Sequence, residues 1–94
     1  MKTDLTKKPG SISYEYLQVM PKVYELQGSN DLSASEKRDE ILIVAIQALN
    51  NAKASKDAYE RKRNDLLNAL TDNDLIRVMQ EVIKNGQNYD DGRG

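Results

Sequence analysis

Residues 33–46 of the chain read SASEKRDEILIVAI, and this stretch predicts a helix. Ser33 and Glu36 have the spacing of a capping box, in which each side chain accepts a hydrogen bond from the other residue's backbone. The run from Ile41 to Ile46 is apolar and rich in β-branched residues, so by itself it also fits a buried strand. The capping box before it and the polar Gln47 after it favour a helix that runs to about Asn51. Because this helix is apolar on every side, several neighbours or a partner must cover it.

Upstream, apolar residues recur at three- and four-residue spacing between Ile12 and Leu26, which predicts an amphipathic helix over about 13–27. Pro21 lies inside this segment and predicts a kink or a break into two short helices. Residues 1–10 are polar and end in a Pro-Gly turn signal, so we expect a flexible arm there.

Downstream, Ser55 can cap a third helix over about 56–70. The charges in its middle predict that it packs less deeply than the others. We expect its inner face to consist of Ala58, Tyr59, Leu66, Leu67 and Leu70.

A second N-cap pattern, Thr71 with Asp74, opens a fourth helix over about 74–84, and Leu70 and Leu75 occupy the hydrophobic-staple positions. We expect this short helix to add little core and to end at Asn85-Gly86 in a left-handed cap. Four such helices with short connections predict an all-α, antiparallel up-down four-helix bundle over residues 11–86. Residues 87–94 are polar and predict a short disordered tail.

Composition restricts the chemistry that this chain can perform. The 94 residues suffice for one domain, and they contain no Cys and no His, which removes the thiolate and imidazole groups of many catalytic and metal sites. The hydroxyls of Ser33, Ser55 and Thr71 are best explained as helix caps, and no glycine-rich phosphate loop is present. We therefore expect no enzymatic activity, no cofactor, no metal and no small-molecule substrate.

Charge and hydropathy restrict the partners. Lys plus Arg is 14 and Asp plus Glu is 15, a balance that argues against a nucleic-acid binder that neutralises many phosphates. The longest apolar run has six residues, far below the roughly 20 that span a bilayer. With no signal peptide recognisable in the first residues, we expect a cytoplasmic protein.

One basic cluster has two interpretations. It can meet an acidic partner or the anionic inner face of a membrane, which keeps peripheral membrane contact open. It can equally be a solvated helix face balanced by Asp57, Glu60 and Asp65, which lie within helical reach. The cluster comprises Lys53, Lys56, Arg61, Lys62 and Arg63.

The order of these segments and the character of their residues resemble those of a known protein family. The charged stretch Arg38-Asp39-Glu40-Ile41-Leu42 leads into an aliphatic helix that ends in Ala48-Leu49-Asn50. The charged third helix contains Leu66-Leu67-Asn68-Ala69-Leu70. A short apolar fourth helix and a polar tail follow. Over about residues 12–90 this layout is similar to the immunity proteins of the enterocin A type, which protect Gram-positive producers from pediocin-like bacteriocins. Many members have a longer tail, whereas here eight residues follow Gly86.

The resemblance implies a non-enzymatic binding protein in the cytoplasm. Such proteins act on the membrane receptor, a sugar-transporter permease with bound bacteriocin, from the cytosolic side, and their C-terminal half governs which bacteriocin is recognised. Carried onto this chain, that half is the third helix, the fourth helix and the tail. The partner-binding residues that we expect there are Arg61, Lys62, Arg63, Tyr89, Asp90, Asp91 and Arg93.

Two other functions stay open. The chain fits a small regulatory adaptor that binds a cytosolic protein through its aliphatic second helix. It also fits a purely structural helical subunit.

Overall fold

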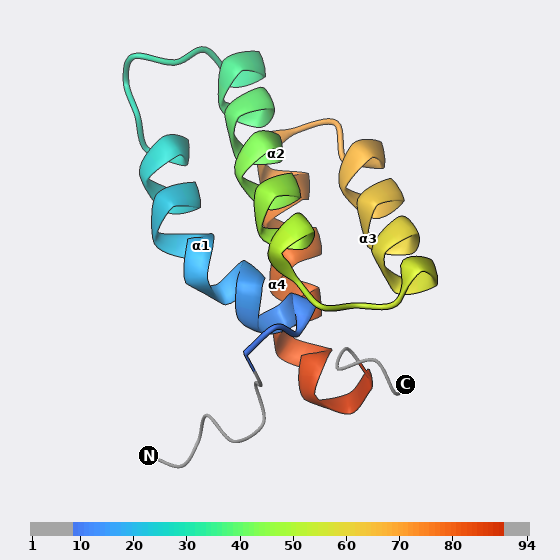
Figure 1. The fold of residues 1–94 in the computed structure, drawn as a ribbon. Helices are drawn as coiled ribbons and strands as arrows, with labels where there is room; N and C mark the ends of the chain where they lie inside the picture. Colours follow the sequence, from blue (N-terminus) through green and yellow to red (C-terminus); the bar gives the residue numbers. More distant parts are fainter. Residues whose placement is uncertain (1–8, 90–94) are drawn as a thin grey trace.

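The computed structural model describes residues 9–89, and this part of the chain contains four helices and no strand (Figure 1). Successive helices run in opposite directions, so the predicted all-α four-helix bundle is confirmed. The helices are α1 (Ile12–Gln27), α2 (Ala34–Asn51), α3 (Lys56–Asn68) and α4 (Asp72–Tyr89).

The helices begin within two residues of the predicted positions, and a hydroxyl caps each of them. Both hydrogen bonds of the Ser33–Glu36 capping box form, with Ser33 N to Glu36 Oε1 at 2.8 Å and Glu36 N to Ser33 Oγ at 3.2 Å. Ser55 Oγ accepts from Ala58 N, and Thr71 Oγ1 accepts from Asp74 N, each at 3.1 Å. These bonds satisfy amides that a helix N-terminus would otherwise leave without partners.

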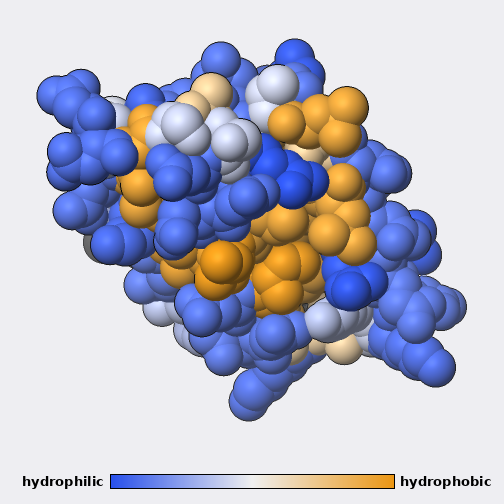
Figure 2. Space-filling model, turned by 90° about the horizontal axis from the view of Figure 1, so that it is seen from above, coloured by the Kyte–Doolittle hydropathy of each residue, from blue (hydrophilic) through white to orange (hydrophobic). Residues whose placement is uncertain are grey.

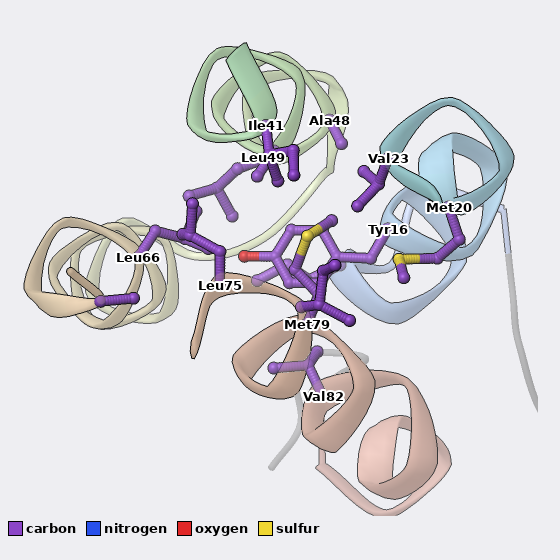
Figure 3. Close-up of a cluster of buried hydrophobic side chains, with 14 residues drawn as sticks. Tyr16, Met20, Val23, Ile41, Ala48, Leu49, Leu66, Leu75, Met79 and Val82 are labelled. Carbon is purple, nitrogen blue, oxygen red and sulfur yellow. The ribbon is translucent and has the colours of Figure 1, made fainter. Parts of the chain in front are cut away.

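The core lies between the four helices, which surround it in the order α1, α2, α3, α4 (Figure 3). The Tyr16 ring extends from α1 into its centre, with the hydroxyl toward the α3 side. From α4, four buried residues enter the core, so the expectation that this helix adds little core is wrong. Within α3 only Leu66 is buried, as its charged composition predicts. Besides Tyr16 and Leu66, the buried hydrophobic residues are Ile12, Met20, Val23, Ile41, Ala45, Ala48, Leu49, Ala69 and, from α4, Leu75, Ile76, Met79 and Val82.

The end of α3 departs from the prediction. The helix stops at Asn68, and Ala69 takes an extended conformation with ψ at 117°. This extended residue places Leu70 in the connection to α4, where it is 77% exposed, so Leu70 does not form the predicted staple with the buried Leu75. Leu67 is also exposed, so the predicted inner face of α3 is wrong at both positions.

The end of α4 also differs from the prediction, because this helix is longer than predicted. The helix continues through Gly86 to Tyr89, and among the described residues the single glycine with positive φ is Gly10. The predicted left-handed cap at Gly86 is therefore wrong, and residues 87–89 are helical. A glycine inside a helix is unfavourable by about 1 kcal/mol relative to alanine, which continued helical hydrogen bonding can offset.

Pro21 does not break α1, which is one helix from Ile12 to Gln27. Its ribbon changes direction along its length (Figure 1), in keeping with a proline that removes one backbone donor. Pro21 is exposed, so water can reach the carbonyl that loses its helical partner.

Arg38 joins the start of α2 to the end of α3. Its Nε donates to the Ala69 carbonyl at 3.1 Å, and its Nη2 donates to the Leu67 carbonyl at 3.3 Å. The last carbonyls of a helix have no partner within the helix. The guanidinium supplies that partner from a neighbouring element and fixes the position of the α3 C-terminus.

Candidate functional site

A groove of about 450 Å³ separates α3 from α4. It exists because α3 packs mainly against α2 and makes few contacts with α4. Only one residue of α3 is buried, so this helix has little apolar surface with which to close the gap. The groove is lined by Lys62, Asp65, Asn68, Ala69, Asp74, Arg77, Val78, Glu81, Val82 and Asn85.

Charges of both signs rim this α3–α4 groove. Lys62 and Asp65 lie on the α3 side. On the α4 side, Asp74 and Arg77 form an ion pair with each other, and Glu81 follows one turn later. Ala69, Val78 and Val82 add apolar surface to the same groove. A polypeptide with apolar and charged side chains matches this mixed lining better than a purely apolar ligand does.

The predicted site residues do not all gather at this groove. Lys62 lines it, whereas Arg61 and Arg63 are exposed on α3 and are not among the lining residues. Tyr89 is the last residue of α4. Asp90, Asp91 and Arg93 lie outside the described residues.

Sequence reasoning missed the α4 side of the groove. Asp74, Arg77, Glu81 and Asn85 follow one another at three- and four-residue spacing, so they form a polar stripe along one face of the helix. That spacing is the signal in the sequence, but charged and polar residues at helical spacing more often form an ordinary solvated face.

The near-zero net charge conceals a separation of charge along the bundle. At the end where α2 and α4 begin, residues 25–40 and 70–74 contain seven acidic and two basic side chains. We call this the acidic end. Residues 52–63, in the α2–α3 connection and the first half of α3, contain five basic and two acidic side chains. The acidic side chains of the acidic end are Glu25, Asp31, Glu36, Asp39, Glu40, Asp72 and Asp74, and its basic side chains are Lys37 and Arg38.

A second, smaller hollow lies at the acidic end. It measures about 360 Å³ and lies between the first residues of α2 and the α3–α4 connection. Leu70 forms part of its wall and is the most exposed of the large hydrophobic residues of the described chain. We call it the Leu70 hollow; its lining residues are Ala34, Ser35, Leu70, Thr71, Asp72 and Asn73.

Residues 9–89 hold no group of three acidic side chains arranged to bind a metal ion. None of the helices in this segment combines the length and the apolar character needed to cross a bilayer.

Comparisons of the chain with protein-family models, curated proteins and solved structures found no match.

Proposed function

We propose that this protein is a bacteriocin immunity protein that binds a bacteriocin-occupied membrane receptor, a sugar-transporter permease, from the cytosolic side. The observation that carries the proposal is the location of the α3–α4 groove. All of its lining residues fall between positions 62 and 85, in the half of the chain to which the family resemblance assigns recognition. The four helices of the structure agree with the helix layout on which the resemblance rests.

The groove supports recognition of a polypeptide. Its two walls present Lys62 and Asp65 from α3 and Glu81 from α4, with Val78 and Val82 beside them. A protein segment can pair with both signs of charge while it covers the apolar atoms. Arg61 and Arg63 stand exposed on α3, where they can meet acidic groups of the receptor or of the membrane surface.

The test is protection of a sensitive cell. We expect expression of this chain to protect an indicator strain against one pediocin-like bacteriocin, or a close group of them. Peptide that is incubated with the purified protein should keep its full killing activity, because protection requires the receptor. Equal killing of expressing and control cells by a panel of such peptides would overturn the proposal.

A groove variant links protection to the site. Val78→Glu places a charge on the apolar side of the groove, and we expect it to reduce protection. Gln47→Glu is the matched control, because Gln47 is exposed on α2 and does not line the groove. Circular dichroism must show that both variants are folded.

One observation favours the regulatory adaptor as the second candidate. Ile43, in the aliphatic run of α2, is 52% exposed, so part of that run faces away from the core. If Ile43→Ser abolished the cellular effect of the protein and Val78→Glu did not, binding through α2 would explain the function better than the groove.

A further inference from the structure

The acidic end of the bundle combines apolar surface with an excess of negative charge. Apolar side chains gather across the middle of this end and hydrophilic ones surround them (Figure 2). Leu70 lies at this end and is 77% exposed beside the hollow that it helps to form. Burial of such a side chain against a partner gains about 25 cal/mol for each Å² of apolar surface removed from water.

Ion pairs neutralise three of the seven acidic side chains of this end, because Asp39, Glu25 and Asp74 pair with Arg38, Lys22 and Arg77. Arg38 directs its guanidinium to the carbonyls at the end of α3 and to Asp39. Lys37 is half-buried. By contrast, Asp31 and Glu40 are exposed and lie outside these ion pairs. A surface with this imbalance attracts cationic groups from beyond contact distance.

We propose that the acidic end binds a basic segment of a partner protein, which inserts a large aliphatic side chain at the Leu70 hollow. The volume of the hollow lies at the low end of the range for ligand pockets, about 300–1,000 Å³. It therefore suits one or two side chains of a short segment. Lysine or arginine residues beside the inserted side chain would face Asp72, which lines the hollow, and would lie in the field of the exposed Asp31 and Glu40.

Charge complementarity selects this occupant over two others. A second copy of the chain docked through the same end would bring two acidic surfaces together, which is unfavourable. A second copy docked through its basic residues 52–63 would bring no exposed large hydrophobic side chain to the hollow. A bilayer with anionic headgroups would be repelled for the same reason. A basic polypeptide gains both from the field of the acidic end and from the burial of Leu70.

The proposed function identifies the source of the segment, and to that extent the inference rests on it. Cytosolic loops of membrane proteins carry an excess of lysine and arginine. A receptor approached from the cytosolic side would therefore present segments of the required charge. This assigns a basic loop of the receptor to the acidic end of the bundle.

The experiment titrates the isotopically labelled full chain with a short synthetic peptide that carries lysines on both sides of two leucines. We expect amide shifts at Ala34, Ser35 and residues 70–73, and weaker binding at higher salt. Two control peptides replace the lysines by glutamate or the leucines by serine, and both should bind at least about tenfold more weakly, which is about 1.4 kcal/mol.

Two variants test the surface separately. Leu70→Ser should weaken binding about tenfold, whereas Leu17→Ser, at an exposed leucine of α1, should leave it unchanged. The double variant Asp31→Asn with Glu40→Gln should weaken binding without alteration of the hollow, because neither residue lines it. Circular dichroism confirms that each variant is folded.

Several results would overturn the inference. These are equal binding of the basic and acidic peptides, shifts confined to the α3–α4 groove, and shifts at Leu70 that appear on concentration of the protein alone. Leu70-dependent binding to vesicles of anionic phospholipid would assign the surface to a membrane instead. If the peptide binds as expected but no bacteriocin is resisted, the proposed function fails and the surface assignment stands.

Discussion

Leu49 and Ile46 lie one turn apart on α2 but differ in burial, which gives a prediction at the residue scale. Leu49 is 1% exposed in the core, and Ile46 is half-buried against it. We expect Leu49→Ala to lower the free energy of unfolding by about 2–5 kcal/mol, because it leaves a cavity among close-packed neighbours. Ile46→Ala should have a smaller effect, of about 1–2 kcal/mol.

Urea denaturation measures both effects, with Ile43→Ala as the control. Ile43 is exposed on the same helix, so its truncation should change stability by no more than about 0.5 kcal/mol. Equal losses at the three positions would mean that α2 is covered on every side, contrary to the burial described above.

Arg38 gives a second prediction at this scale. Arg38→Met keeps much of the length of the side chain but removes its hydrogen bonds to the carbonyls of Leu67 and Ala69. We expect a loss of about 1–2 kcal/mol in urea denaturation, together with faster amide exchange at the C-terminal end of α3.

Arg77→Met is the matched control for Arg38. The Arg77 side chain is 69% exposed and pairs with Asp74 one turn away on the same helix, whereas the Arg38 side chain is 22% exposed. Exposed pairs of this kind contribute little, so we expect a change within about 0.5 kcal/mol. A similar loss for both variants would show that the contacts of Arg38 with α3 have no special role.

At the scale of elements, the sequence was informative where one local interaction decides the outcome. The Ser33–Glu36 capping box and the Thr71 cap each depend only on a few neighbouring residues at the start of one helix. Both are present in the structure as predicted. The wrong predictions concern Leu67, Leu70, Gly86 and the contribution of α4 to the core, where local patterns compete with tertiary packing. Neither the exposure of Leu70 nor the continuation of α4 could be derived from spacing alone, because both depend on where neighbouring helices end.

Gly86 allows a direct test of how α4 ends. Since the helix continues to Tyr89, Gly86→Ala should raise the free energy of unfolding by about 0.5–1 kcal/mol through its better helix propensity. A glycine in a left-handed cap would respond in the opposite sense, because alanine is strained at positive φ. Thermal or urea denaturation of the variant therefore distinguishes the two helix ends by the sign of the change.

At the scale of the whole molecule, folding gathers acidic and basic side chains at different places on the bundle, although their numbers in the chain are nearly equal. The net charge of −1 gives no sign that acidic residues gather where α2 and α4 begin and basic ones where α2 joins α3. The candidate site could be predicted only in part for the same reason. The basic neighbours of Lys62 in the sequence indicate it as a site residue, whereas Arg77 and Glu81 join it only through the packing of α4 beside α3.

The arrangement of both hollows predicts which part of the chain sets specificity. The groove is lined only by residues 62–85, and four of the six residues that line the Leu70 hollow belong to the segment 70–73. Exchange of residues 55–94 with those of a related immunity protein should therefore transfer the range of bacteriocins that the cell resists. The measurement compares survival of sensitive cells that express each parent and each chimera.

Both reciprocal chimeras are needed, because the junction must preserve the bundle. A junction before Ser55 falls in the α2–α3 connection and leaves both flanking helices complete, but it divides the contact of Arg38 with the α3 C-terminus. Each chimera must therefore show a cooperative urea transition before survival is compared. If a folded chimera resists the bacteriocins of its N-terminal parent, recognition lies in α1 or α2, and the exposed Ile43 surface replaces the groove as the candidate site.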